Sequence, residues 1–272
     1  MKENGIGPGQ IIRRRKDGSL EYDRDELTIE EPLEIRIGDK TVATTMRTPG
    51  HDEELAGGFL LSEAIVRPGD EIKKFSRPKS ARNRENIIVV DLAGGEKIKL
   101  NSTQRFGTIS SSCGLCGKES IDAIGQSFPP IKTSKFRIGI AILLSLPERL
   151  RTSQSHFART GGIHAAGIFD ASGNPLIVRE DIGRHNAVDK AIGRAFLDGK
   201  LPLDRHVLLV SGRASFEIMQ KALAARIPII ASISAPSRLA MEFSRAMNQT
   251  LIGFLRPPSF NIYSHVERVI LD

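Results

Sequence analysis

The pattern of hydrophobic and polar positions changes near residue 133. Before that point, short extended apolar stretches flank one helical segment. After it, apolar runs of strand length alternate with amphipathic segments of helical length. Such alternation is typical of a sheet that is buried on both faces by helices and is at least partly parallel. The sequence therefore predicts an α/β (α+β overall) protein with two domains, residues 1–132 and 133–272.

The first predicted domain is a small β-grasp-like roll, because a strand pair, a helix and a second strand pair follow one another. Its predicted elements are strands 33–37 and 41–46, a helix over 52–65, and strands 86–92 and 97–100. Upstream, the run Arg13-Arg14-Arg15-Lys16 indicates a solvated arm or edge strand. Residues 73–84 hold six basic residues and no acid, which favours an exposed loop that is solvated or that steers an anionic partner.

The second predicted domain is a three-layer α/β unit. The apolar run 138–144 fits a strand or a helix equally well. The other predicted elements are strands 165–169, 176–180, 206–210, 227–232 and 250–255, and helices 147–160, 183–197, 215–225 and 237–247.

Composition narrows the class of protein. The chain has 272 residues, of which 40% are hydrophobic and 26% charged, which is typical of a soluble globular protein and not of a disordered one. No stretch approaches the roughly 18 apolar residues of a membrane span, and the N-terminus does not read as a signal peptide. The two cysteines exclude a disulfide framework, so we expect a reducing, cytoplasmic location and thiol chemistry.

Charge points to the kind of partner. Thirty-nine Lys and Arg residues against 32 Asp and Glu give a net charge of +7, which suits an anionic partner. Aromatic residues make up only 5% of the chain and Trp is absent, which disfavours repeated stacking on nucleic-acid bases. We therefore expect phosphate groups as ligands, with neither nucleic acid nor a membrane as partner.

The most informative motif is Ser110-Ser111-Ser112-Cys113-Gly114-Leu115-Cys116-Gly117. If a helix begins here, its N-terminus would favour the thiolate forms of Cys113 and Cys116. Four interpretations compete: half of a zinc site completed by His residues, a thioredoxin-like dithiol, an inert turn, and a sulfur relay through a persulfide. Zinc deaminase chemistry is excluded, because His164 is followed by Ala165-Ala166 and no proton-shuttling Glu stands there.

Three further motifs fall at predicted junctions of strands and helices, where α/β sheets bind anionic ligands. They are residues 160–167 with Gly161 and Gly162, residues 180–190 with Arg184 and His185, and residues 210–215 with Arg213. His185 is either a general base oriented by Asp189, four residues later on the same helix face, or a structural residue. None of the three is a P-loop for nucleoside triphosphate hydrolysis, and together they predict a phosphate-bearing ligand.

Taken together, the motifs resemble the formate dehydrogenase accessory sulfurtransferase family (FdhD). The matching stretches run in order over about residues 30–265: Glu31-Pro32-Leu33, Thr48-Pro49-Gly50, Glu54-Leu55-Ala56-Gly57-Gly58-Phe59, Ser112-Cys113-Gly114-Leu115-Cys116-Gly117, Thr160-Gly161-Gly162-Ile163-His164-Ala165-Ala166, residues 180–190, Ser211-Gly212-Arg213, Gly253-Phe254-Leu255-Arg256 and Phe260-Asn261-Ile262-Tyr263.

The resemblance implies a cytoplasmic homodimer with a cytidine-deaminase-like domain. Such a protein takes sulfur from a cysteine desulfurase and passes it to the molybdenum cofactor, in its bis(molybdopterin guanine dinucleotide) form, for formate dehydrogenase. By position, Cys113 would carry the persulfide and Cys116 would be its companion, with no permanent metal. The rival interpretation is a non-catalytic chaperone that binds the cofactor and whose Cys pair is structural or zinc-bound.

The expected cofactor-binding residues come from two sources. The resemblance implies a binding segment made of Phe254, Leu255, Arg256, Pro257, Pro258 and Ser259, in which Pro257-Pro258 departs from the glycine-rich stretch of the family. The junction motifs add Arg213, Arg184, His185, Gly161 and Gly162.

Overall fold

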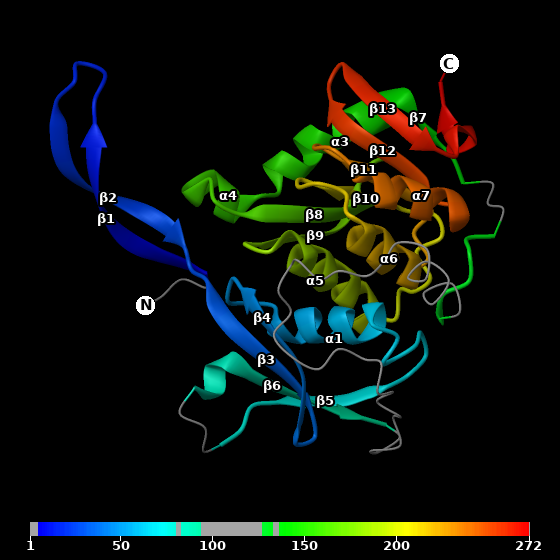
Figure 1. Ribbon diagram of the computed structural model, residues 1–272, viewed down its shortest axis with the longest axis horizontal. Coiled ribbons are helices and arrows are strands. Elements are labelled where there is room, and N and C mark those ends of the chain that lie inside the picture. The colour runs from blue at the N-terminus through cyan, green and yellow to red at the C-terminus, as the bar shows by residue number, and fades with distance from the viewer. Residues whose placement is uncertain (1–4, 80–82, 94–126, 133–135, 272) are drawn as a thin grey trace.

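The computed structural model describes residues 5–79, 83–93, 127–132 and 136–271. Cys113, Cys116 and the predicted strand 97–100 lie outside the described residues. Within those ranges the chain forms a mixed α/β structure with two principal sheets (Figure 1). None of the helices in these ranges reaches the length and apolarity that crossing a membrane requires.

The N-terminal residues form a two-stranded antiparallel hairpin, here called the arm. It consists of β1 (Ile6–Arg14) and β2 (Leu20–Thr28), and it projects away from the rest of the molecule (Figure 1). At its base, Glu26 pairs with Arg159 and the Thr28 hydroxyl donates to the Thr160 hydroxyl over 2.9 Å. The predicted solvated arm is thus confirmed as a strand pair held to the body at one end.

The first sheet has the order β4-β3-β6-β5. Its strands are β3 (Glu31–Ile37), β4 (Lys40–Arg47), β5 (Ile72–Ser76) and β6 (Ile87–Leu92), with helix α1 (Asp52–Ser62) between β4 and β5 and the short 3-10 turn η1 (Arg84–Asn86) before β6. The predicted hairpin and helix are confirmed, and β3 and β6 are parallel neighbours.

One prediction in this sheet is wrong. The described partner of β6 at the outer edge is β5, which comes from the segment predicted to be an exposed basic loop. Ile72 and Phe75 pack against the core, whereas Lys73 and Lys74 are exposed. Lysines on an edge strand prevent pairing with other chains, so a basic run is compatible with a strand at this position.

The second sheet has the order β13-β12-β11-β10-β8-β9, in which β10, β11 and β12 are parallel. Its strands are β8 (His164–Phe169), β9 (Pro175–Asp181), β10 (Val207–Val210), β11 (Ile229–Ser232), β12 (Thr250–Arg256) and β13 (Ser259–Ser264). The predicted five strands are confirmed within two residues, and β13 is additional.

Helices cover both faces of this sheet, which confirms the predicted three layers. Alternate residues of β10 separate the two cores: Val207 and Leu209 face α3, while Leu208 and Val210 pack with the helices of the other face. The helices are α3 (Ile140–Thr152) on one face and α5 (Arg184–Leu197), α6 (Phe216–Ala224) and α7 (Arg238–Ala246) on the other (Figure 1).

The apolar run 138–144, which fits a strand or a helix in sequence, contains both. Residues 138–139 form the short strand β7 (Ile138–Gly139), which pairs with β14 (Val269–Ile270) after the 3-10 turn η3 (Val266–Arg268), and α3 begins immediately afterwards. The single helix predicted for 147–160 is two helices, because α3 ends at Thr152 and α4 (Ser155–Thr160) begins after a break.

Close packing of α1 on α5 joins the two halves. A Cβ atom on Gly58 would lie 1.9 Å from the Asp189 carbonyl oxygen, and one on Gly193 would lie 1.8 Å from the Glu54 carbonyl oxygen. Only glycine permits the backbones to approach this closely. One hydrophobic core therefore contains residues of both sheets, from Leu33 of β3 to Ile230 of β11.

Candidate functional site

The three junction motifs meet where β8 begins and its neighbours β9 and β10 end, which is one end of the strands of the larger sheet. Strand β8 runs antiparallel to its neighbours β9 and β10, so its first residue, His164, lies beside their last residues. The Ala165 N–H donates to the Ser211 hydroxyl over 2.9 Å, and the Ser211 N–H donates to the Ala165 carbonyl over 3.0 Å. Ser232, at the end of β11, donates to the Gly212 carbonyl over 2.7 Å.

We call the polar residues gathered there the strand edge: His164, Arg184, His185, Arg213 and Arg256. A Cβ atom on Gly212 would lie 3.3 Å from both Arg184 Cβ and His164 Cε1, so the glycine leaves room for these side chains to converge. Arg213 is exposed, and the Arg184 Nε atom is buried with no hydrogen-bond partner among the described residues.

The electrostatics of the strand edge favour an anion. Burial, together with the positive charge of Arg213, lowers the pKa of Arg184 below its usual range. Burial and the charge of Arg184 likewise lower the pKa of His164. Cations that destabilise one another in this way are stabilised by a bound negative group, so the geometry suits a phosphate or another polyanion.

His185 points to different partners from those expected. Its Nε2 atom lies 3.0 Å from the Ser215 hydroxyl and 3.1 Å from Glu217 Oε2. Burial, with Lys221 and Arg184 nearby, lowers its pKa to about 3. The imidazole is therefore neutral at pH 7, with Nε2–H as the donor toward the carboxylate.

The hypothesis that Asp189 orients His185 is wrong. Asp189 accepts two hydrogen bonds from Lys221 Nζ, at 2.8 and 2.9 Å, and one from the Ser62 hydroxyl at 2.9 Å. All three groups are buried. Although His185 and Asp189 share a helix face, Asp189 is turned toward α1 and α6 and has a structural role.

Two cavities flank the strand edge, and Ile182 lines both. The first, here called the edge cavity, has a volume of about 690 Å³ and contains the predicted Gly161 and Gly162. Its lining is Pro147, Arg151, Gln154, Phe157, Gly161, Gly162, Ile163, His164, Ile182, Ser211 and Ile233. This volume lies within the range of small-molecule and cofactor sites.

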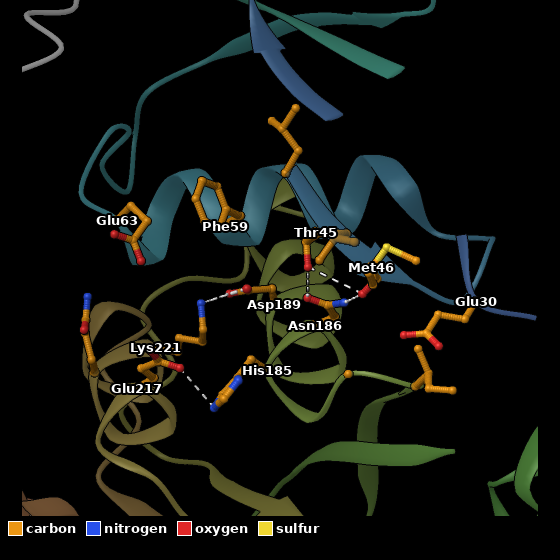
Figure 2. A pocket seen from close by; sticks show the side chains of 15 residues that line it. Glu30, Thr45, Met46, Phe59, Glu63, His185, Asn186, Asp189, Glu217 and Lys221 are labelled. Atoms are coloured by element: carbon orange, nitrogen blue, oxygen red, sulfur yellow. Dashed lines mark hydrogen bonds and ion pairs between the residues drawn. The ribbon is translucent and has the colours of Figure 1, made fainter. Parts of the chain in front are cut away.

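The second cavity, here called the helix cavity, has a volume of about 440 Å³ and lies between α1, α5, α6 and β4 (Figure 2). It contains the predicted His185, together with apolar Met46 and Phe59 and acidic Glu30, Glu63 and Glu217. In Figure 2, Glu30 and Glu63 lie at opposite ends of the cavity. Gly161 and Gly162 thus line one cavity and His185 the other, whereas the predicted Arg184, Arg213 and segment Phe254–Ser259 line neither of the two.

The segment Phe254–Ser259 lies at the same sheet edge, at the turn from β12 to β13. The Arg256 Nε–H donates to the Ile233 carbonyl over 2.9 Å, and Ile233 lines the edge cavity. Phe254 is 38% exposed and adopts a left-handed backbone conformation (φ 51°), which is costly for a residue other than glycine. Leu255 is fully buried, so only its backbone is available to a ligand.

Some residues that line these cavities belong to no motif that marks them in the sequence as candidate binding residues. Arg151 and Phe157 come from α3 and α4, and the Arg151 guanidinium lies 4.3 Å from the Phe157 ring centroid. Ser232–Ser234 could have been found, because this turn links a strand to a helix as the other junctions do. Among the described residues, no cluster of His, Cys, Asp or Glu is arranged to hold a metal ion.

Other motif residues hold the two halves together. Asp181 and Lys190 form a fully buried ion pair at 2.6 Å, and Lys190 Nζ donates to the Thr48 carbonyl over 2.8 Å. Asn186 donates to the Asp181 carboxylate and to the Met46 carbonyl. These contacts join Asp181, Asn186 and Lys190 to Met46 and Thr48, so these members of the motifs have a structural role.

The comparisons with known proteins agree with the sequence motifs. Residues 28–270 match the model of the FdhD/NarQ family. Among curated proteins, the chain is 46% identical to the "Sulfur carrier protein FdhD" of Streptomyces coelicolor over 97% of both chains. It is 41% identical to the protein of the same name from Thermoplasma volcanium over 98% of both chains.

A solved structure supports the fold. The crystal structure of a "putative formate dehydrogenase accessory protein" from Desulfotalea psychrophila superposes with a TM-score of 0.76 at 22% identity, over 98% of this chain and 100% of that one. The family model and the curated relatives both span nearly the whole length of the sequence. The chain therefore belongs to the FdhD/NarQ family.

Proposed function

We propose that this protein is a sulfur carrier that accepts sulfur as a persulfide on Cys113 and delivers it to a molybdenum cofactor. The observation that carries the proposal is the full-length similarity to proteins named sulfur carrier protein FdhD, in a chain whose two cysteines form one Cys-x-x-Cys motif. The sulfur donor would be a cysteine desulfurase, and formate dehydrogenase would receive the cofactor.

This protein supplies two thiols to the reaction, and the sulfur donor and the reductant come from other molecules. The Cys113 thiolate attacks the terminal sulfur of a desulfurase persulfide, a new S–S bond forms, and the desulfurase thiolate leaves with the electron pair of the broken bond. For release, the Cys116 thiolate attacks the inner sulfur of the Cys113 persulfide. The products are a Cys113–Cys116 disulfide and one sulfur atom at the sulfide level. The dithiol must then be restored by a cellular thiol reductant.

The strand edge supports a role in binding the recipient. Bis(molybdopterin guanine dinucleotide) carries several phosphates, and Arg184, Arg213 and Arg256 gather at the edge beside the 690 Å³ edge cavity. Because His185 is neutral at pH 7, it would contribute a hydrogen bond and no charge. Arginine is well suited to phosphate because its planar group donates two parallel hydrogen bonds.

The finer assignments belong to the same proposal. The order β4-β3-β6-β5 with a parallel central pair supports a β-grasp-like first unit, and the three layers around the larger sheet support a cytidine-deaminase-like second unit. We also propose that the protein is a cytoplasmic homodimer, as the family resemblance implies. It would hold no permanent metal, since the cofactor and the sulfur would both be transient cargo.

Intact-mass measurement after incubation with a cysteine desulfurase and cysteine tests the sulfur step. The wild-type protein should gain a sulfur adduct of about 32 Da that is removed by a thiol reductant. Cys113→Ala should abolish the adduct, while the matched variant Cys116→Ala should keep it and fail to release sulfur. An adduct that persists in Cys113→Ala would contradict the assignment.

The rival function is a chaperone that binds the cofactor and whose cysteines are structural or zinc-bound. Metal analysis and alkylation rates separate the two. A relay predicts fast alkylation of both thiols that added zinc does not slow. Stoichiometric zinc with strong protection of both thiols, reversed by a chelator, would favour the rival.

A further inference from the structure

The arm has two faces of different chemistry. Residues directly opposite each other in an antiparallel pair share a face, and the register pairs Ile12 with Tyr22 and Gln10 with Arg24. The outer half of one face, here called the basic face, therefore carries six side chains with no acid among them: Gln10, Ile12, Arg14, Leu20, Tyr22 and Arg24. The other face of the ribbon is mixed in charge, with Arg13, Glu21, Asp23 and Asp25.

The side chains of the basic face are poorly satisfied within the protein. In the part of the chain that the structure describes, neither Arg14 nor Arg24 forms an ion pair, whereas Arg13 on the other face pairs with Asp23 at 3.1 Å. The three apolar side chains of the basic face are strongly exposed: Tyr22 by 91%, Leu20 by 69% and Ile12 by 61%. Tyrosine and arginine are enriched among the residues that dominate binding at protein interfaces. The basic face therefore has the composition of an interface.

The inner half of the same face is fixed to the body beside the edge cavity. Glu26 and Thr28 follow on this face of β2, and they pair with Arg159 and Thr160 of α4. A Cβ atom on Gly162, which lines the edge cavity, would lie 3.8 Å from the Thr28 hydroxyl oxygen. The basic face thus continues outward, along one face of the ribbon, from the rim of the edge cavity (Figure 1).

The edge cavity extends the positive charge of the basic face. Arg151 lines the cavity and is exposed, and its guanidinium lies over the Phe157 ring. None of the described lining residues is acidic. An acidic protein surface would therefore be attracted both by the outer half of the arm and by the rim of the cavity. Complementary charge of this kind raises the rate of association and fixes the orientation of the partner.

The position of the arm indicates which kind of protein would bind it. Each arm strand has nine residues, which span about 30 Å. A typical protein interface covers about 800 Å² on each partner, which is roughly 30 Å across. A protein that binds the basic face is therefore held beside the edge cavity, and its surface can extend over the cavity. This position favours a partner that exchanges a ligand with the cavity over a lipid surface, which would have no use for it.

We propose that the basic face of the arm docks an acidic surface of the enzyme that receives the cofactor, and holds that enzyme over the edge cavity during transfer. The inference rests on the proposed function, because it takes the edge cavity to hold part of the cofactor. Arg14 and Arg24 would pair with carboxylates of the enzyme. Tyr22, with Leu20 and Ile12 beside it, would bury apolar area at the centre of the contact.

Binding of the full-length protein to cofactor-free formate dehydrogenase, measured by biolayer interferometry, tests the docking. Arg14→Glu/Arg24→Glu should lower the association rate constant about tenfold at modest salt and weaken its dependence on salt concentration. Tyr22→Ala keeps the charge and should instead raise the dissociation rate constant about tenfold. The matched control is Lys73→Glu/Lys74→Glu, at exposed positions of β5. It makes the same change in net charge, from +7 to +3, and should bind as the wild type does.

Two further measurements separate the docking from the proposed function. The arm variants should still gain the sulfur adduct of about 32 Da from the desulfurase and should still bind GDP, because neither step needs the arm. A wild-type protein that gains no adduct would overturn the proposed function, and the enzyme-binding measurement would still decide the docking. Arm variants that gain the adduct, bind GDP and bind the enzyme as the wild type does would overturn the docking alone.

Three other results would assign the basic face to a different partner and overturn the proposal. They are a halved molar mass of the arm variants in light scattering, which indicates a second copy of the chain, loss of sulfur loading, which indicates the desulfurase, and loss of binding to anionic vesicles, which indicates a lipid surface. Circular dichroism establishes that each variant is folded. Because Arg14, Arg24 and Tyr22 are all exposed, we expect no loss of structure.

Discussion

Two regions of this molecule contain residues of the family motifs and differ in how the charges of their side chains are satisfied. The first is the helix interface: Glu54, Gly58, Asp189, Gly193 and Lys221. There every charge meets an opposite one, as Lys221 meets Asp189 at 2.8 Å and Glu54 meets Arg179 at 2.8 Å. The second is the strand edge, where the charges of Arg184 and Arg213 act on each other and Arg256 lies at the end of β12.

The comparison shows how to separate structural motif residues from binding residues. At the helix interface, Asp189, Lys221 and Ser62 are buried, and they hydrogen-bond to one another within the protein. Groups paired in this way do not need a ligand to satisfy them. At the strand edge, the Arg184 Nε atom is buried without a described partner and Arg213 is exposed. Buried donors are normally paired, so a donor without a protein partner indicates that a ligand or water completes it.

The largest expected effect comes from breaking the buried pair at the helix interface. Lys221→Met leaves the Asp189 carboxylate buried without its cation, which should lower the free energy of unfolding by about 3–5 kcal/mol. Chemical denaturation measures this, with the exposed pair member Arg238→Met as a control expected to cost under about 0.5 kcal/mol. Adding Asp189→Leu to Lys221→Met should restore part of the loss; equal stability of Lys221→Met and wild type would show that the pair is not structural.

The glycine contacts give the next largest effect. Gly58→Ala places a methyl group 1.9 Å from the Asp189 backbone, which cannot move away as a side chain can, and should cost about 3 kcal/mol. Gly57→Ala is the matched control: its Cβ atom would lie 3.7 Å from Leu197 and Phe196, which is ordinary contact. That variant should be neutral or up to about 1 kcal/mol more stable, because alanine favours a helix. Similar unfolding midpoints for the two variants would refute close packing of α1 on α5.

The two regions should also respond to acid in different pH ranges. The pKa of His185 falls to about 3 in the folded state from 6.5, so below pH 6.5 the unfolded state takes up a proton that the folded state does not. By this linkage the free energy of unfolding should fall by about 2 kcal/mol between pH 7 and pH 5, and His185→Asn should remove that slope.

Glu54 provides the contrast at the helix interface. Burial raises its pKa, but hydrogen bonds from Arg179 and His51 outweigh burial and lower the pKa to about 2 from 4.5. Its stabilisation is therefore complete above pH 4.5 and is lost as the pH falls through 2. Glu54→Gln should flatten the stability curve only below pH 4.5. If both variants changed the same pH range, the assignment of distinct titrations to the two regions would be wrong.

Substitutions at the strand edge should have the smallest effect on the free energy of unfolding. They should have the largest effect on the affinity for a phosphate-bearing ligand. Arg213→Ala should change the free energy of unfolding by less than about 0.5 kcal/mol, because the side chain is exposed. It should weaken the binding of GDP, used as a phosphate-bearing probe, about tenfold in calorimetry at modest salt. Arg205→Ala, two residues before β10 and at the opposite end of the sheet, is the control and should bind GDP as the wild type does.

Much of the fold could be predicted from local patterns. The five predicted strands of the second half, and helices such as α7, follow the sequence within a few residues, because the continuous burial of β10 and the one-sided burial of α7 are both visible in the order of apolar residues. Errors occurred where local pattern is ambiguous. The basic strand β5 pairs at a sheet edge and contributes only two apolar residues to the core, so its local pattern predicts a loop.

The position of the candidate site could be predicted from the sequence, but the hydrogen-bond and ion-pair partners of its side chains could not. That the three junction motifs meet at one end of the larger sheet follows from the strand ends alone, and the structure brings Arg184 and Arg213 together there. Helical spacing, however, gave only the face on which His185 and Asp189 lie. Their partners are set by residues distant in sequence: Lys221 lies 32 positions after Asp189, and Ser215 lies 30 after His185.

The sequence by itself therefore determined the order of elements, the layered α/β architecture of the second half, and the motifs that identify the family. Tertiary structure decided which motif residues are structural and which remain available to a ligand. The physical reason is that periodicity reports burial, which depends on near neighbours along the chain, whereas the satisfaction of a buried charge depends on groups that only folding brings together. Asp189 and Arg184, five residues apart on one helix, are assigned opposite roles for that reason.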